Sequence, residues 1–178
     1  MSLEPNSWRL PEIYNYAEVK IRRAELSEVD LIKNILNDAY APVKKQLSRA
    51  PAALKEDMGK ISRHIQMGNQ YVALIGNQVV GTMRVTLSGQ IGVIERLAVS
   101  STFRNRRIGS LLVQYAENLM EAMDATCIEL EVYGRVEEQQ KFYDRIGYKE
   151  TTRQKRSGEE IVLMRKNFNE EVEEEEPL

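Results

Sequence analysis

The residues best suited to do chemistry lie in one stretch, where an apolar run at 94–99 leads through a short polar turn into a periodic helix near residue 108. A helix that begins just after a strand directs unpaired backbone N–H groups and the positive end of its dipole at one point, which favours phosphate. Four arginines crowd around this turn: Arg96, Arg104, Arg106 and Arg107. Guanidinium groups add charge-assisted hydrogen bonds to the same ligand. The stretch therefore predicts a site for an anion.

The main alternative to a phosphate site at this turn is an ordinary strand-to-helix turn with solvated arginines. Two other phosphate-binding loops are excluded, because the sequence contains neither Gly-x-x-x-x-Gly-Lys-Ser/Thr nor Gly-x-Gly-x-x-Gly.

Candidate acid–base groups lie near the same turn. Glu95 precedes it, Glu131 lies in an alternating run at 127–133, and Tyr143 follows in a short helical segment. Ligands bind at the carboxyl ends of neighbouring strands that a helix connects, and a carboxylate there can take a proton directly or through water. The alternatives are a solvated strand residue for Glu131, an ion-pair partner of Arg96 for Glu95, and a structural hydroxyl for Tyr143.

Hydrophobic periodicity gives the elements that must position these residues. The clearest amphipathic helix covers 108–123, where apolar residues recur every three to four positions. Alternating or β-branched runs predict strands, and glycine turns predict hairpins. The expected strands are 19–24, 71–75, 79–87, 91–99, 127–133, 148–153 and 160–165, and the expected helices are 28–39, 51–66, 108–123 and 136–146. The order β-α-α-β-β-β-α-β-α-β-β predicts an α/β (α+β mixed) fold: one mixed, mostly antiparallel twisted sheet with helices on both faces.

Length and charge indicate how the chain is organised. A sequence of 178 residues that is 42% hydrophobic and 29% charged predicts one domain with a substantial core. We expect an irregular lead-in at 1–17, the domain at 18–168 and a disordered tail at 169–178 that contains six glutamates. Removing those six charges from the net charge of −2 leaves the rest at +4. That mild basicity suits a polyanionic ligand but is too weak to predict nucleic-acid binding.

The sequence also indicates in which compartment the protein is expected and which metal sites it can form. An N-terminus without a signal pattern, and the lack of a long apolar run, predict a cytoplasmic protein without a membrane partner. Cys127 is the only cysteine, which excludes an internal disulfide and fits a reducing compartment. With His64 as the only histidine, we expect no metal site built from soft ligands and no Ser-His-Asp or Cys-His catalytic group.

Two motifs resemble signatures of the GNAT N-acetyltransferase superfamily. The segment 104–109, Arg-Asn-Arg-Arg-Ile-Gly, resembles the family's pyrophosphate motif Gln/Arg-x-x-Gly-x-Gly/Ala. The segment 142–148, Phe-Tyr-Asp-Arg-Ile-Gly-Tyr, resembles its Phe-Tyr-x-x-x-Gly-Phe/Tyr signature, and 164–166 is similar to family endings. Two positions depart from the pattern: Arg107 stands where the motif usually has glycine, and Val136 stands where the last helix often starts with asparagine.

The resemblance implies a GNAT-like fold that transfers an acetyl group from acetyl-CoA to a primary amine by direct attack on the thioester, without a metal. The pantetheine arm would pair with backbone groups of Leu97, Ala98 and Val99, between the strand ending at Val99 and the strand ending near Tyr133. The pyrophosphate would be held by residues of the turn and first helical turn: Arg104, Asn105, Arg106, Arg107, Ile108, Gly109 and Ser110.

The resemblance also implies catalytic roles. A backbone N–H at 97–99 would stabilise the oxyanion, Glu131 or Glu95 would accept the amine proton through water, and Tyr143 would protonate the departing thiolate.

Alternatives remain for function and partners. A different class of function is a GNAT-fold module that binds an acyl-CoA for regulation or interaction without catalysis. Arg107 and the acidic tail are compatible with this alternative. Within the enzyme interpretation we expect a small-molecule amine as acceptor, with a protein amine as the alternative. A homodimer through an exposed strand of the final hairpin is a further expectation.

Overall fold

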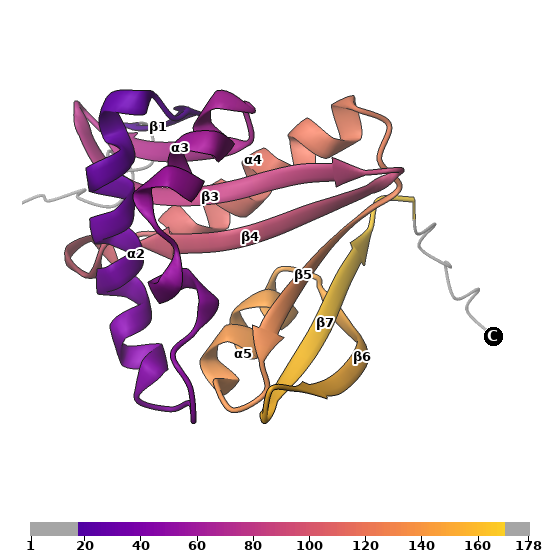
Figure 1. Cartoon of the computed structure of the whole chain (residues 1–178). Coiled ribbons are helices and arrows are strands. Elements are labelled where there is room, and N and C mark those ends of the chain that lie inside the picture. The colour runs from indigo at the N-terminus through magenta and orange to yellow at the C-terminus, as the bar shows by residue number, and fades with distance from the viewer. Residues whose placement is uncertain (1–17, 170–178) are drawn as a thin grey trace, which may run out of the picture.

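The centre of the protein is a seven-stranded sheet with the order β1-β2-β3-β4-β5-β7-β6, seen in a computed structural model that describes residues 18–169 (Figure 1). The strands are β1 (Val19–Arg23), β2 (Gln70–Ile75), β3 (Gln78–Ser88), β4 (Ile91–Val99), β5 (Cys127–Tyr133), β6 (Lys149–Arg156) and β7 (Glu159–Asn167). Every neighbouring pair is antiparallel except β4 and β5, which are parallel. The predicted mixed, mostly antiparallel sheet is confirmed.

Helices cover both faces of this sheet. The α-helices are α2 (Val29–Lys44), α3 (Met58–Gln66), α4 (Ile108–Ala122) and α5 (Glu137–Arg145), and short 3₁₀ turns are η1 (Leu26–Glu28), η2 (Ala52–Lys55) and η3 (Ser101–Phe103). Figure 1 shows α2 and α3 in front of β3 and β4, with α4 behind them.

The core lies in two layers, one on each face of the sheet. Leu112 and Met120 of α4 belong to one apolar cluster, and Leu36 of α2 belongs to the other. The inner strand β2 contributes to both, because Tyr71 faces the α4 layer and its neighbour Val72 faces the α2 layer. Because helices cover both faces of the sheet at β2, both sets of its side chains are buried, and the strand is a continuous apolar run.

The helices before β2 differ from the prediction in two places. The helix expected to end before residue 40 runs on to Lys44, with Pro42 in its last turn, where a proline removes a single helical hydrogen bond. The helix expected over 51–66 is two elements, η2 and α3. They separate because Asp57 accepts a hydrogen bond from the Lys60 N–H and starts α3 as a helix N-cap.

Other expectations concern segments at the ends and edges of the chain. The expected lead-in and the acidic tail beyond Asn169 lie outside the described residues. The edge strand of the final hairpin is β6, which is exposed along its whole length. It is rich in Lys and Arg, a composition that discourages pairing between edges, so the homodimer stays a prediction. In the described part of the chain, no helix combines the length and apolarity needed to cross a membrane.

Candidate active site

The site begins where β4 and β5 part. Their parallel register runs only from Ile91 opposite Cys127 to Val93 opposite Glu129. Beyond these residues the strands diverge, as Figure 1 shows, and the carboxyl-terminal halves of both strands border a gap. Backbone groups on such an edge can pair with an extended ligand as a further strand would.

A β-bulge in β4 shapes one side of the gap. The register with β3 shifts between Glu95 and Ala98. As a result, Arg96 and Leu97 together lie opposite the single residue Met83. Arg96 has a φ of 55°, in the left-handed region that few residues other than glycine adopt. The bulge bends the strand and directs backbone groups away from β3.

The direction of the backbone differs among the three residues expected to bind the pantetheine arm. The Ser100 N–H donates to the Val80 carbonyl of β3 at 2.8 Å. Alternate residues of a strand face the same side, so Ala98 also faces β3 while Val99 faces the gap. The bulge places Leu97 on the gap side as well. Leu97 and Val99 therefore form the edge that borders the gap, and Ala98 is engaged with β3.

The arginine-rich turn joins this strand to α4. Asn105 and Arg107 have φ values of 61° and 58°, and Arg107 is the N-cap residue of α4. A left-handed conformation at this position explains why a glycine suits the motif. Arg104, Asn105, Arg106 and Arg107 are exposed, Ile108 is buried, and Gly109 and Ser110 are partly exposed. The exposed arginines thus lie next to the first N–H groups of α4, and the anion site stays a prediction.

Contacts of Ser101 and Arg106 hold the turn in place. Asp38 of α2 accepts hydrogen bonds from the Ser101 N–H at 2.6 Å and the Ser101 hydroxyl at 3.0 Å. The Arg106 guanidinium lies 5.2 Å from the centre of the Phe103 ring, within range of a cation–π contact. Gly109 lies beside the Phe142 ring, at a distance where a Cβ would make an ordinary van der Waals contact of 3.4 Å.

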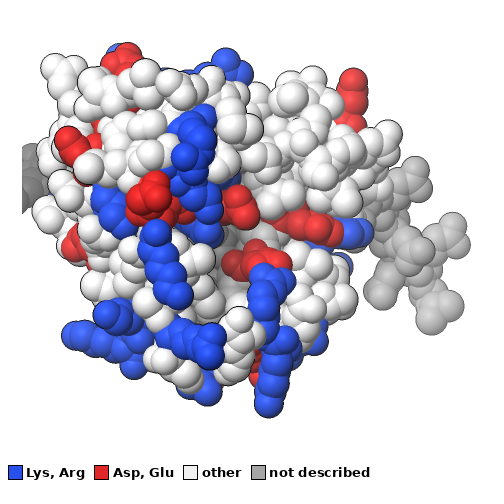
Figure 2. Space-filling model, in the orientation of Figure 1, with Lys and Arg blue, Asp and Glu red and all other residues white. Residues whose placement is uncertain are grey.

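The gap opens into a cleft of about 910 Å³. Its walls come from α2 and η2, from β4, β5 and β7, and from α5, and the members used below are Tyr40, Arg49, Lys55, Glu95, Leu97, Arg104, Glu129, Glu131, Tyr133, Glu138, Gln139, Tyr143 and Glu159. Figure 2 shows acidic and basic side chains next to one another around the hollow in the middle of this face.

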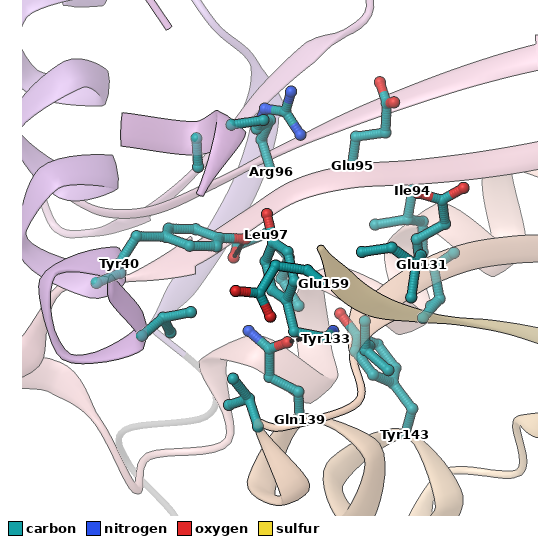
Figure 3. Close-up of a pocket in the computed structure, with 18 of the residues that line it drawn as sticks. Tyr40, Ile94, Glu95, Arg96, Leu97, Glu131, Tyr133, Gln139, Tyr143 and Glu159 are labelled. Carbon is teal, nitrogen blue, oxygen red and sulfur yellow. Dashed lines mark hydrogen bonds between the residues drawn. The ribbon is translucent and has the colours of Figure 1, made fainter. Parts of the chain in front are cut away.

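Two tyrosines reach this cleft from opposite sides. Tyr143 of α5 is 8% exposed, and burial raises the pKa of its hydroxyl above the ordinary value of 10.0. Tyr40 of α2 donates its hydroxyl hydrogen to the Leu97 carbonyl at 3.1 Å, and burial raises the pKa of Tyr40 to about 12. Figure 3 shows them on either side of the central space. Both hydroxyls therefore stay protonated at neutral pH.

The two expected carboxylates, Glu131 and Glu95, line the cleft but differ in their hydrogen-bond partners and in the direction of their side chains. Glu131 is exposed and accepts two hydrogen bonds from Arg156, at 2.9 and 3.0 Å. Glu95 is exposed, and its side chain points away from the centre of the cleft (Figure 3). Either can exchange protons with water at the cleft, and neither is held against Tyr143.

Sequence reasoning missed three polar residues of this region. Glu56, just after η2, is buried between Arg84 and Arg96. Arg84 had a visible signal, because it is an arginine inside an otherwise apolar strand. Glu159 gave none, since it follows a turn and looks like a solvated charge, yet it is buried at the cleft. Tyr40 gives no signal either, because in the sequence it lies just after the expected end of the first helix.

Metal ligation has no basis in the described region. Among residues 18–169, no group of three or more His, Cys, Asp or Glu side chains is arranged to hold a metal ion. The chemistry available here is that of backbone amides, arginines, tyrosines and carboxylates.

Comparison with known proteins places this geometry in a family. Residues 30–148 match the acetyltransferase (GNAT) family, so the chain belongs to this family. A comparison with curated proteins gives no significant match.

Solved structures share the fold at low sequence identity. A PaiA N-acetyltransferase from Thermoplasma acidophilum, solved in complex with coenzyme A, is 14% identical with a TM-score of 0.75, over 84% of this chain and 99% of that one. The ribosomal-protein-S18-alanine N-acetyltransferase of Escherichia coli is 12% identical with a TM-score of 0.69, over 88% and 97% of the two chains. Ard1 from Thermoplasma volcanium is 17% identical with a TM-score of 0.68, over 84% and 97%.

Proposed function

We propose that this protein transfers the acetyl group of acetyl-CoA to a primary amine of a small molecule. The observation that carries the proposal is that Leu97, on the free edge of β4, and the buried Tyr143 line the same cleft. Family membership supports acetyl transfer. It does not identify the acceptor, which the residues lining the cleft must select.

The residues of the chain fit acetyl-CoA as the donor. The edge at Leu97 and Val99 suits the amide groups of a pantetheine arm, which would add to the sheet as a short strand. The start of α4, with exposed Arg104 and Arg106 close by, suits the pyrophosphate. These two features are joined by one short turn, so a single extended ligand can occupy both.

The reaction needs no enzyme nucleophile. The acceptor nitrogen attacks the thioester carbon, so that a C–N bond forms and the carbonyl oxygen becomes an oxyanion, which the Leu97 N–H stabilises. The C–S bond then breaks, its electron pair stays on sulfur, and Tyr143 supplies a proton to the thiolate. The nitrogen loses its extra proton to a water molecule, and this water passes a proton to the carboxylate of Glu131 or Glu95. Tyr143 can take the acid role because it lines the cleft and its hydroxyl is protonated at neutral pH, since burial raises its pKa.

Cofactor binding and turnover test this proposal separately. We expect acetyl-CoA to raise the melting temperature, because a ligand that binds only the folded state stabilises it, and we expect dephospho-CoA to raise it less. We also expect thiol release from acetyl-CoA to depend on an added primary amine. A melting shift without amine-dependent thiol release would instead support the non-catalytic acyl-CoA-binding module.

A further inference from the structure

We propose that Glu159 forms a subsite for a second cationic group of the acceptor, so that the preferred acceptor is an amine with a second ammonium group, such as an α,ω-diamine. The inference rests on the proposed function and names the substrate class of the same cleft.

The first observation is an unsatisfied buried oxygen. Glu159 is only 5% exposed, and its Oε1 accepts a hydrogen bond from the Ser48 N–H. Its Oε2 is buried and has no hydrogen-bond partner among the described residues. The nearest cation is Arg135, whose Nε lies 3.6 Å from that oxygen, beyond hydrogen-bond range. A buried carboxylate oxygen without a donor is costly, and a ligand N–H that binds it removes the cost.

The second observation is the direction of this side chain. Glu159 lines the cleft, and Figure 3 shows its carboxylate in the central space, near Tyr40 and Gln139. It is not turned outward to solvent, as an exposed strand glutamate would be. The hydrogen bond from the Ser48 N–H lowers the pKa of Glu159, so the group is a carboxylate at neutral pH. It therefore offers a negative charge to a ligand in the cleft.

Register places Glu159 beyond Tyr133, which also lines the cleft. Tyr133 of β5 lies opposite Ile161 of β7. Glu159 precedes Ile161 by two residues, so it lies about 7 Å farther along the strand than the level of Tyr133, at roughly 3.3 Å per residue. Side chains two apart share a face, so Glu159, Ile161 and Tyr133 line the same side of the sheet. That offset is comparable to the length of a short alkyl chain.

Other acidic groups of the cleft are less suited to this role. Glu131 pairs with Arg156 and Glu129 with Arg165, each through a hydrogen-bonded ion pair. Glu159 also has an arginine nearby, but the Arg135 Nε lies 3.6 Å from its Oε2 and donates no hydrogen bond to it. Two lining arginines, Arg96 and Arg156, are paired with Glu56 and Glu131. The other lining cations, Arg49, Lys55 and Arg104, are exposed, where solvent and salt screen their repulsion of a cationic ligand. Glu159 is the buried charge of the set, so its interaction with a ligand is the least screened.

Paired substrates give the direct test. Diaminopentane and pentylamine have the same alkyl chain and differ by one ammonium group. We expect kcat/KM of the wild-type protein to be about 10- to 100-fold higher for the diamine, the range of one hydrogen bond between charged groups. Glu159→Gln keeps the side-chain size and the acceptor for Ser48 but removes the charge. It should abolish that preference, mainly by raising KM for the diamine.

The matched control is Glu138→Gln, because Glu138 also lines the cleft but is exposed. It should keep the preference for the diamine. If Glu159→Gln does not fold, a chain-length series in the wild type replaces it, and diaminoethane, too short to reach Glu159, should lose the advantage that diaminopentane has. Equal wild-type rates for diaminopentane and pentylamine, or a preference that survives Glu159→Gln, would overturn the subsite.

Calorimetric titration of diaminopentane into the wild-type protein with coenzyme A separates this inference from the proposed function. Binding that Glu159→Gln abolishes, without turnover of any amine, would support the subsite and contradict the proposed function. Turnover of pentylamine with no advantage for the diamine would support the function and overturn the subsite.

Discussion

The Glu56 carboxylate accepts a hydrogen bond from the Arg96 Nε at 2.7 Å and thereby ties the start of α3 to the bulge of β4. Its other oxygen accepts from the Arg84 Nη2. The side chains of Glu56 and Arg84 are 0% and 1% exposed, and Arg84 also donates to Gln70. A buried carboxylate thus sits between two arginines, one in the sheet and one at the bulge whose neighbour Leu97 borders the cleft.

Removing the charge of Glu56 should destabilise the fold. Glu56→Gln leaves two guanidinium groups without their counter-charge, and breaking a buried pair in this way costs about 3–5 kcal/mol. Urea unfolding at pH 7 measures the change in the free energy of unfolding. A matched control is Glu150→Gln, which removes an exposed partner of Arg153. The control should change stability by much less, and similar losses for both variants would contradict the role given to Glu56.

The same ion pair predicts how stability depends on pH. Burial raises the pKa of Glu56, but hydrogen bonds from Arg84 and Arg96 outweigh it, and the pKa in the folded state lies below the ordinary 4.5. A depressed pKa contributes stability above the unfolded value that is lost as the pH falls through the folded value. The stability difference between wild type and Glu56→Gln should therefore narrow below about pH 4.5. A constant difference between pH 7 and pH 3 would show that the carboxylate charge is not involved.

The backbone of Arg96 gives a prediction about catalysis. Its φ of 55° suits glycine and is unfavourable for a β-branched residue. Both Arg96→Gly and Arg96→Val remove the contact with Glu56, but only glycine retains the bulge easily. We expect kcat to fall more in Arg96→Val than in Arg96→Gly, because the Leu97 N–H is displaced from the thioester. Equal kcat values for the two variants would mean that the bulge geometry does not matter.

Arg107 allows a test of the turn before α4. A non-glycine residue at φ 58° costs about 1 kcal/mol relative to glycine. Arg107→Gly should therefore raise the free energy of unfolding by about that amount. It should also bind acetyl-CoA at least as tightly, because the backbone can approach the pyrophosphate more closely. Calorimetry measures both effects. Weaker binding in Arg107→Gly, with a steeper loss at high salt for the wild type, would show that the charge of Arg107 holds the ligand.

The sequence predicted the elements better than the contacts between them. Periodicity located the strands and α4, because burial on one face repeats along the chain. The placing of Tyr143 at the cleft followed from the family signature. The partners of Glu56 and Glu159 could not be predicted, since Glu56 lies 28 residues from Arg84 and Glu159 lies 111 residues from Ser48. A charge held by a distant partner looks in sequence like a solvated one.

The central claim is that Tyr143 and the β4 edge act on one thioester. The most direct test measures acetyl-CoA binding and acetyl-amine formation in Tyr143→Phe. Loss of the proton donor should lower kcat about 100-fold or more, while the dissociation constant of acetyl-CoA changes little. Tyr148→Phe is the control, because this buried tyrosine donates to Glu117 and lies outside the cleft. Its kcat should stay near that of the wild type. An unchanged kcat in Tyr143→Phe would contradict the account.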